Sequence, residues 1–215
     1  MSIQAILFDL DGTLIDQFEA IHRAFSRTIS GMGIPPPSYE KVKRSIGGAS
    51  EETMIKLIGA EHAKEAVRRL RPIFEEEMLN GVLTLPYVHE GLKALCNNGI
   101  CCGVLTNKYG PHARATCEYL GLSQFLKFTL GTSDTQWKKP ASQLTKIALD
   151  KLGYGTNQTT YVGDSPYDFK TAENVAMTCH LVATGTHTKE ELEALQATSC
   201  HQNFKSVVST LLSLS

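Results

Sequence analysis

Hydrophobic residues follow two different patterns along this chain. Close to its start, Ala5–Phe8 is an unbroken apolar run, which is typical of a strand that is buried on both faces. Residues 16–31 then carry apolar side chains at spacings of three and four, at Phe18, Ile21, Phe25 and Ile29. This spacing predicts an amphipathic helix that ends at Gly31.

Three more helices are expected before residue 84. Helical patterns cover Tyr39–Ile46, Glu51–Ile58 and His62–Leu79, and Pro72 interrupts the last of them. The sequence shows no strand pattern among these helices. We therefore expect residues 16–83 to form an all-helical cap, inserted beside the end of the first strand.

From about Leu85 onward, strand patterns alternate with helical patterns. The expected strands are Ile100–Leu105, Lys127–Leu130, Thr159–Val162 and Thr178–Val182. The expected helices are Glu90–Asn97, Pro111–Leu120, Ser142–Leu152, Tyr167–Val175, Lys189–Ala197 and Phe204–Leu212. This alternation predicts an α/β fold, a Rossmann-like parallel sheet core with helices on both faces and an inserted α-helical cap. Residues 1–15 and 84–215 would form the core.

The composition narrows the class of partner. Lys and Arg number 21 and Asp and Glu number 22, so the formal net charge is -1. This balance gives no reason to expect nucleic acid or a membrane surface as the main partner, and a small diffusible substrate is the simpler expectation. The start of the chain lacks the pattern of a secretory signal, and no run approaches the roughly 18 apolar residues of a membrane-spanning helix. We expect a cytoplasmic protein.

Six cysteines are spread along the chain without a CxxC pair. Irregular spacing of this kind favours small buried thiols in a reducing compartment over a metal site or a redox site. We therefore assign the cysteines no chemistry.

The first apolar run ends on two carboxylates, Asp9 and Asp11, which one residue separates. Since successive side chains of a strand point to opposite faces, these two fall on the same side. Two like charges that lie close together are costly unless a cation lies between them or one of them carries a proton. An ordinary alternative is an Asp-Gly turn after an edge strand, so partners elsewhere in the chain must decide.

Three later segments also place polar groups near strand ends. Thr106 and Asn107 follow one predicted strand and offer hydrogen bonds to an anion. Lys139 lies at the start of a predicted helix, where anions are favoured. Asp164 and Asp168 follow another predicted strand. Each segment alone is also an ordinary turn or helix start, but the ordered set predicts a site for a magnesium ion and a phosphoryl group.

The segments LFDLDGTLID, LTNK, KKP and VGDSPYD resemble the haloacid dehalogenase superfamily of phosphotransferases. That superfamily carries four motifs in this order: DxDGT, Thr or Ser, Lys, and GDxxxD. The resemblance covers essentially the whole chain, and it includes the helical insertion of the subclass whose cap follows strand one. The motif details look most like the phosphoglycolate phosphatase-like branch.

The resemblance implies a role for each matching residue. Asp9 would attack phosphorus and form an aspartyl-phosphate. Asp11 would protonate the leaving alkoxide and would then take a proton from the attacking water. Thr106 and the backbone of Asn107 would hold phosphoryl oxygens. Lys139 would neutralise charge on the nucleophile and on the phosphate.

Mg²⁺ is the cofactor that the resemblance implies. It would be held by Asp9, by the main-chain carbonyl of Asp11 and by Asp164. Asp168 would be either a further ligand or a partner that positions Lys139.

The implied activity is that of a magnesium-dependent phosphatase acting on a small phosphorylated metabolite, which could be phosphoglycolate-like, a sugar phosphate or a nucleotide. Dehalogenases lack the second aspartate of the first motif, so Asp11 favours phosphate chemistry. A β-phosphoglucomutase-like phosphotransferase is an alternative, but such mutases typically have glutamate where this chain has Gly163. A third alternative is a non-catalytic protein of the same fold that binds phosphate-bearing ligands.

In this subclass the cap closes over the leaving group, so we expect cap residues to select the substrate. Arg44 could meet a substrate carboxylate, and Gly47 and Gly48 would allow close approach. A solvated basic helix end with a glycine cap is the ordinary alternative for this loop. Gln17 stands where relatives commonly have serine, and it could alter the fit of the substrate. We expect a monomer or a homodimer.

Overall fold

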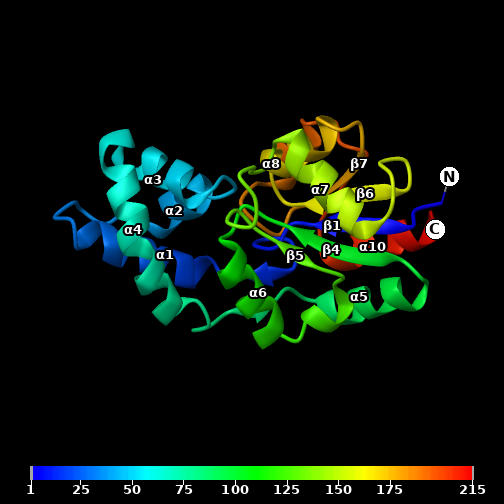
Figure 1. The fold of residues 1–215 in the computed structure, drawn as a ribbon, viewed down its shortest axis with the longest axis horizontal. Coiled ribbons are helices and arrows are strands. Elements are labelled where there is room, and N and C mark those ends of the chain that lie inside the picture. Colours follow the sequence, from blue (N-terminus) through cyan, green and yellow to red (C-terminus); the bar gives the residue numbers. More distant parts are fainter. Residues whose placement is uncertain (1, 215) are drawn as a thin grey trace.

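The computed structural model describes residues 2–214, which form a parallel sheet flanked by helices and a separate group of helices beside it (Figure 1). The sheet is made of β1 (Ala5–Phe8), β4 (Cys101–Leu105), β5 (Thr129–Leu130), β6 (Thr159–Gly163), β7 (Thr178–Val182) and β8 (Ser199–His201). The strand order is β5-β4-β1-β6-β7-β8, and all neighbouring pairs are parallel. The predicted Rossmann-like α/β class is confirmed.

Alternating side chains of the central strand supply both faces of the sheet. In β1, Ile6 and Phe8 join the hydrophobic cluster on one face, and Ala5 and Leu7 join the cluster on the other. The first face is covered by α5 (Val88–Asn97), α6 (Gly110–Tyr119) and α10 (Phe204–Ser213), and the second by α7 (Ser142–Leu152), α8 (Pro166–Glu173) and α9 (Lys189–Glu193). Burial on both sides explains why this strand is apolar at every position.

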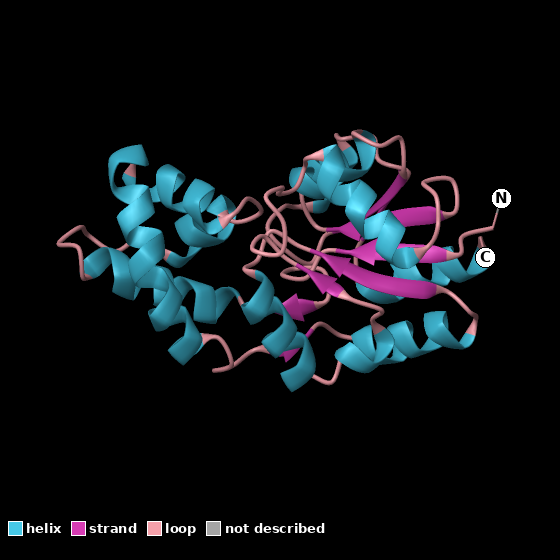
Figure 2. Cartoon of the chain, in the orientation of Figure 1, coloured by secondary structure: helices cyan, strands magenta, loops and turns pink. Residues whose placement is uncertain are grey.

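Four further helices pack on one another away from the end of the molecule where the termini lie (Figure 1, Figure 2). They are α1 (Phe18–Ser30), α2 (Tyr39–Ser45), α3 (Ser50–Ile58) and α4 (Ala60–Glu77). These helices enclose a hydrophobic cluster of their own, to which Phe18, Phe25 and Leu70 belong. The apolar stripe predicted for the first helix is the face that it buries here. We call this group of four helices the cap.

A short antiparallel ribbon joins the cap to the rest of the chain. β2 (Ile15–Asp16) and β3 (Leu83–Thr84) pair at the two points where the chain enters and leaves the cap. The ribbon lies at the limits expected for the insertion. The division into a core of residues 1–15 and 84–215 and a cap of residues 16–83 stays a prediction.

Several short elements differ from the sequence patterns. The ribbon strands, the 3-10 turn η1 (Ser123–Phe125) and the edge strand β8 were not expected. β8 is polar and half-buried and pairs only with β7, so neither an alternating pattern nor an apolar run marks it. The helix expected to reach Ala197 ends at Glu193. The last cap helix continues through Pro72, which is exposed, so that water can satisfy the carbonyl left without a partner.

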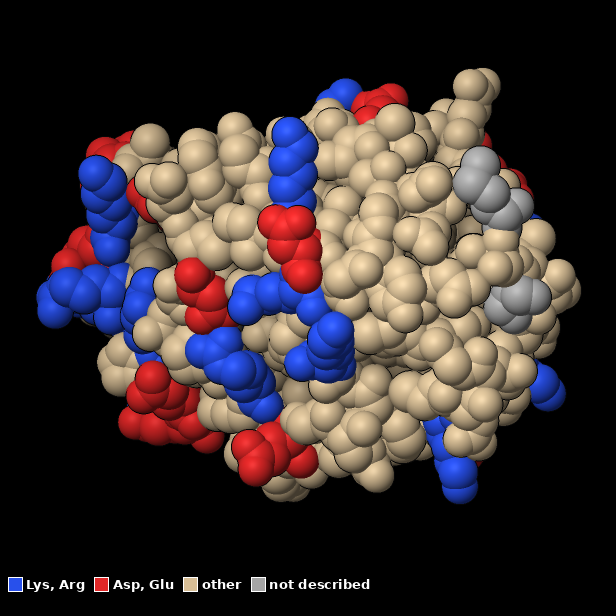
Figure 3. Space-filling view, turned by 45° about the vertical axis from the view of Figure 1, so that its right-hand side comes forward, with Lys and Arg blue, Asp and Glu red and all other residues tan. Residues whose placement is uncertain are grey.

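The surface agrees with the balanced composition. On the face shown in Figure 3, Lys and Arg side chains lie next to Asp and Glu side chains, as the net charge of -1 leads one to expect. Within residues 2–214, no helix has both the length and the apolar character that crossing a bilayer requires.

Candidate active site

Asp9 lies where the central strand ends, in contact with a buried lysine. Its backbone N–H donates to the carbonyl of Val162 at 2.9 Å, which continues the pairing of β1 with β6. The Nζ of Lys139 lies 2.9 Å from Asp9 Oδ1. Burial raises the pKa of Asp9 to about 6, against the lowering effect of Lys139. The candidate nucleophile is therefore a buried carboxylate held beside a cation.

Lys139 itself is almost completely buried and has three polar neighbours. Besides Asp9, its Nζ donates to Asp168 Oδ1 at 2.7 Å and to the hydroxyl of Tyr161 at 3.1 Å. Burial alone would lower the pKa of Lys139, but the carboxylates of Asp168 and Asp9 outweigh it and raise the pKa well above its ordinary value. The lysine is thus held in its charged form.

Asp164 and Asp168 come from the turn after β6 and take different surroundings. Asp164 Oδ2 accepts from the backbone N–H of Thr186 at 2.8 Å and from its hydroxyl at 3.1 Å. Asp168 caps α8: its Oδ2 accepts from the N–H groups of Asp164 and Ser165 and from the Ser165 hydroxyl. With Lys139 on Oδ1, both oxygens of Asp168 have protein donors.

The acidic residues of this site fit a divalent cation. Asp9, Asp164 and Asp168 are buried and each offers an oxygen within 4.8 Å of the others. Lys139 contributes one positive charge against these three carboxyl groups. Burial, and then repulsion from Asp168 and Asp9, raises the pKa of Asp164 well above its ordinary value. Carboxylate oxygens that lack sufficient counter-charge are what a hard cation such as Mg²⁺ binds.

Two polar side chains at the end of β4 form hydrogen bonds to neighbouring parts of the site. Thr106 is buried, and its hydroxyl accepts from the backbone N–H of Lys108 at 3.2 Å. The Asn107 side chain accepts from the N–H of Lys139 at 2.9 Å and donates to the carbonyl of Gly47 in the cap at 3.0 Å. The strand end that is expected to hold phosphoryl oxygens therefore also contacts the lysine segment and the cap.

Asp11 is held by a lysine that the sequence analysis did not single out. Lys108 Nζ lies 3.0 Å from both carboxylate oxygens of Asp11, and both residues are largely buried. The same ammonium lies 4.9 Å from the centre of the Phe74 ring, which belongs to the cap. The place of Lys108, directly after Thr106 and Asn107 in LTNK, is the one signal in the sequence that could have identified it.

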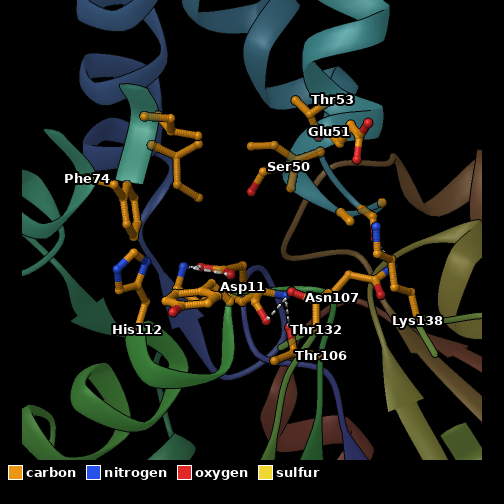
Figure 4. Close-up of a pocket in the computed structure, with 18 of the residues that line it drawn as sticks. Asp11, Ser50, Glu51, Thr53, Phe74, Thr106, Asn107, His112, Thr132 and Lys138 are labelled. Atoms are coloured by element: carbon orange, nitrogen blue, oxygen red, sulfur yellow. Dashed lines mark hydrogen bonds and ion pairs between the residues drawn. The ribbon is translucent and has the colours of Figure 1, made fainter. Parts of the chain in front are cut away.

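Asp11, Thr106, Asn107 and Lys108 line a cavity of about 210 Å³ between the cap and the sheet, whereas Lys139 and Asp168 are not among its lining residues (Figure 4). Asp11, Thr106 and Asn107 lie on its lower side in this view, and Ser50, Glu51 and Thr53 approach from above. Asp9 and Asp164 also border the cavity. The strand ends and the cap thus enclose one space beside the candidate nucleophile.

Sequence and structure comparisons assign the chain to a family. A family model described as haloacid dehalogenase-like hydrolase matches residues 6–182. The chain belongs to this family. Relatives include a protein of Dickeya dadantii named probable phosphatase IndB, 30% identical over 94% of this chain and 91% of its own length. A phosphoglycolate phosphatase of Yersinia pestis is 29% identical over 83% of this chain and 80% of its own length.

The fold of this hydrolase is shared with solved structures. A haloacid dehalogenase-like hydrolase of Streptococcus pneumoniae superimposes with a TM-score of 0.88 over 97% of this chain and 98% of its own. The sequence identity is 22%, so this likeness concerns the fold alone. Membership of a hydrolase family agrees with the enzyme predicted from the sequence.

Of the four residues predicted to select the substrate, two border the cavity of the hydrolase. Gly47 and Gly48 line it. Arg44 and Gln17 are not among its lining residues: Arg44 donates to the carboxylate of Glu191 and to the carbonyl of Thr186, and Gln17 is buried and donates to the carbonyl of Met78. A carboxylate partner for Arg44 exists, but it belongs to α9 of the chain.

Several cavity residues of the hydrolase had no signal in the sequence. Phe74 and His112 pack ring against ring with centroids 5.2 Å apart, one from the cap and one from α6. The Arg71 guanidinium lies over the Tyr109 ring at 4.2 Å from its centre. Each pair joins residues that are more than 30 positions apart, so neither periodicity nor a motif could indicate it. Thr186, which positions Asp164, lies 22 positions away from it, and no motif marks that contact either.

Proposed function

We propose that the chain is a magnesium-dependent phosphatase that hydrolyses a small phosphomonoester through an aspartyl-phosphate on Asp9. The observation that carries this proposal is the buried group in which Lys139 lies 2.9 Å from Asp9 and 2.7 Å from Asp168, beside Asp164. A nucleophilic carboxylate, a fixed cation and room for a metal ion are the parts that phosphoryl transfer needs. Relatives named phosphoglycolate phosphatase give independent support.

Asp9 and Asp11 have different roles in the proposed reaction. An oxygen of Asp9 forms a bond to phosphorus while the ester P–O bond breaks, and Asp11 gives a proton to the departing alkoxide. For this step Asp11 has to carry a proton, and so its ion pair with Lys108 has to be released beforehand. Water then attacks the aspartyl-phosphate, Asp11 takes the proton from that water, and inorganic phosphate leaves Asp9. Lys139 stabilises the charge that develops next to Asp9, since its ammonium is already in place.

The remaining motif residues hold the phosphoryl group and the cation. Thr106 and the backbone of Asn107 would donate hydrogen bonds to phosphoryl oxygens at the end of β4. Asp9, the main-chain carbonyl of Asp11 and Asp164 would hold Mg²⁺, which when bound neutralises charge on the phosphoryl oxygens. Asp168 acts as the positioning partner of Lys139, because protein donors occupy both of its oxygens.

Hydrolysis is favoured over a mutase reaction by the packing at the end of β6. A Cβ on Gly163 would lie 2.2 Å from Asp168 Cγ. The glutamate that mutases of this superfamily typically carry at this position has no room while Asp168 lies against Lys139. Asp168, which contacts Lys139, therefore fills the space that a glutamate at position 163 would need.

The direct test is hydrolysis of an aryl phosphate in the presence of Mg²⁺ by the wild-type protein and by Asp9→Asn. The amide retains the shape of the side chain but is a poor nucleophile, so turnover should fall by about three orders of magnitude or more. A panel of phosphoglycolate, sugar phosphates and nucleoside monophosphates then identifies the substrate. Equal rates for both proteins would reject the catalytic proposal and favour a phosphate-binding protein without activity.

The proposal also covers the partner, the oligomeric state and the location of the enzyme. The partner is a small phosphorylated metabolite, and the chain works as a monomer or a homodimer. The six cysteines are free thiols in the structure, which supports a reducing, cytoplasmic location.

A further inference from the structure

The part of the cavity wall that the cap helices α1 and α4 form is largely apolar, and Ser50, Glu51 and Thr53 of α3 line another part. Residues of two cap helices border the space opposite the strand ends, namely Ile21 and Phe25 of α1 and Val67, Leu70 and Phe74 of α4. All five belong to or pack against the hydrophobic cluster of the cap, and part of their surface faces the cavity instead of another cap residue. A leaving group above Asp9 would therefore meet hydrocarbon on this side.

The charges of the cap offer little to an acidic leaving group. Among the described cap residues that line the cavity, Arg71 carries the one positive charge and Glu51 the one negative charge. Arg71 is exposed, and its guanidinium lies 4.2 Å from the centre of the Tyr109 ring. On the sheet side, Lys108 and Lys138 line the cavity as well; Lys108 is paired with Asp11, and Lys138 is half-buried. The five apolar residues of α1 and α4 carry no charge, so a substrate carboxylate that pointed toward them would lie against hydrocarbon.

Several contacts hold this wall against the site. Arg44 pairs with Glu191, and the Asn107 side chain donates to the carbonyl of Gly47 at 3.0 Å. The Tyr167 hydroxyl donates to Glu52 at 3.1 Å. These links join the α2–α3 side of the cap to Asn107, to α8 and to α9. They keep the cap closed on the core, and the apolar residues of α1 and α4 therefore form a boundary of the cavity.

We infer that the enzyme prefers phosphate esters of uncharged alcohols with an apolar body of several carbon atoms over esters of small acids such as glycolate. This inference rests on the proposed phosphatase function and names the class of leaving group for that site. Burial of the alcohol's hydrocarbon against Phe25, Val67 and Leu70 supplies binding free energy, and the phosphoryl group remains beside Asp9. The esterified alcohol would leave with its apolar body still in contact with the cap.

The test compares two alkyl esters that differ in size and one ester of a small acid. Ethyl phosphate, 3-methylbutyl phosphate and 2-phosphoglycolate are assayed with Mg²⁺, and kcat/KM is measured for each. Each buried methylene should raise kcat/KM by about fourfold, so 3-methylbutyl phosphate should exceed both ethyl phosphate and 2-phosphoglycolate at least tenfold. Equal values for the two alkyl esters, or a preference for 2-phosphoglycolate, would overturn the inference and leave the phosphatase function intact.

A conservative variant of the wall gives a second measurement. Val67→Thr keeps the shape of the side chain and places a hydroxyl on the wall, so the preference for 3-methylbutyl over ethyl phosphate should shrink by about threefold or more. Ile55→Thr, on the exposed outer side of the cap, should leave the preference unchanged. An unchanged preference in Val67→Thr would count against the inference. If the wild-type protein hydrolyses no ester faster than Asp9→Asn, the proposed function itself fails.

Discussion

Lys139 is the residue on which the electrostatics of the site depends. Its ammonium is buried between the carboxylates of Asp9 and Asp168, which together keep it charged. Desolvation of the three groups is costly, and their close contacts offset that cost. One buried cation therefore contacts both carboxylates, and we expect it to affect the stability of the fold and the position of Asp9, the proposed nucleophile.

Replacement of this lysine should damage stability and activity together. Lys139→Ala leaves two buried carboxylates without a counter-charge, and loss of one partner of a buried ion pair costs about 3–5 kcal/mol. Hydrolysis should fall by about a hundredfold or more, because the fixed positive charge beside the nucleophile is lost. Urea denaturation and aryl phosphate hydrolysis measure the two effects.

The matched control is Lys170→Ala, which removes an exposed ion pair with Glu173. Exposed pairs contribute about 0–1 kcal/mol, so the urea midpoint should change little. A wild-type midpoint for Lys139→Ala would contradict the role given to this lysine.

For single residues of the site, the sequence identified those that lie at strand ends. Asp9 and Asp164 directly follow buried strands, so their positions in the chain predicted their meeting at one edge of the sheet. Lys108 lies at such an end too, but its partner Asp11 is 97 positions away. Pairing between side chains of separate loops depends on their final placement, which no local pattern contains.

Among the elements, α2 and α9 show how a cap residue can take a partner within the chain. Arg44 at the end of α2 bonds both oxygens of Glu191, at 2.9 and 2.5 Å, and the Thr186 carbonyl at 2.7 Å. The sequence suggested that Arg44 meets a substrate carboxylate. The structure gives it the carboxylate of Glu191, so its effect on catalysis should pass through the position of the cap.

Arg44→Ala and Glu191→Gln should therefore have the same consequence. Each variant loosens the cap and should raise KM by roughly two- to fivefold for acidic and neutral esters alike, an effect that added salt should mimic. The double variant should be no worse than Arg44→Ala, because that change already removes the pair and the contact with the Thr186 carbonyl. If Arg44→Ala raises KM for acidic esters alone, Arg44 contacts the substrate directly.

The edge of the sheet carries a pH-sensitive contact. His180 of β7 is buried, and its Nδ1 lies 2.7 Å from the Ser199 hydroxyl of β8. Burial, and then the neighbouring His201, lowers the pKa of His180 from 6.5 to about 4. Below pH 6.5 the unfolded chain binds a proton that the folded chain does not, so stability is complete above that pH and declines toward pH 4.

The loss should reach up to roughly 3 kcal/mol for a shift of this size. The raised pKa of Asp9 acts in the opposite direction over part of this range, so the comparison is between proteins that share it. The free energy of unfolding of the wild-type protein relative to that of His180→Gln should decrease between pH 6.5 and pH 4. His62→Gln, which removes an exposed histidine, serves as control and should keep the wild-type slope. Identical slopes for wild type and His180→Gln would contradict this assignment.

The elements that the sequence predicted are those with a regular apolar pattern. The stripe at Phe18 and Phe25 marks α1, and the continuous run marks β1, because each buries one face or both faces of a long element. β8 and the ribbon strands are short and their burial is irregular. Their pairing depends on neighbouring strands that are already in place, and the local sequence does not contain that information.

For the whole molecule, binding of a cation should appear as a gain in stability. Three buried carboxyl groups repel one another in the free protein, and a bound divalent ion relieves that repulsion. Mg²⁺ at 100 times its Kd should stabilise the protein by about 2.7 kcal/mol, which calorimetry detects as a higher Tm. Removal of the ion with a chelator should reverse the shift.

Asp164→Asn separates this effect from non-specific salt binding. The amide removes one of the three charges, so the variant should show little rise of Tm with Mg²⁺, and without the ion it should be at least as stable as the wild-type protein. Asp150→Asn, an exposed position on α7, should respond as the wild-type protein does. A full Tm shift in Asp164→Asn would exclude this residue as a ligand.

The order of the four motifs predicted the overall assembly because parallel strands bring their carboxyl ends to one edge. The same logic could not predict the apolar wall at Val67 and Leu70, since those side chains look like ordinary core residues of a helix pair. Only the arrangement of cap against sheet turns part of that core into a boundary of the cavity.

The ribbon of β2 and β3 has a mechanical consequence for the cap. Ile15 pairs with Thr84 and Asp16 pairs with Leu83, so the two connecting segments are bonded to each other. Two tethers joined in this way cannot slide or twist independently, and the cap can turn only about the axis that they share. The contacts Arg44–Glu191, Asn107–Gly47 and Tyr167–Glu52 attach the opposite, α2–α3 side of the cap to the core. If these contacts open while the ribbon stays paired, the alcohol product would leave on the α2–α3 side.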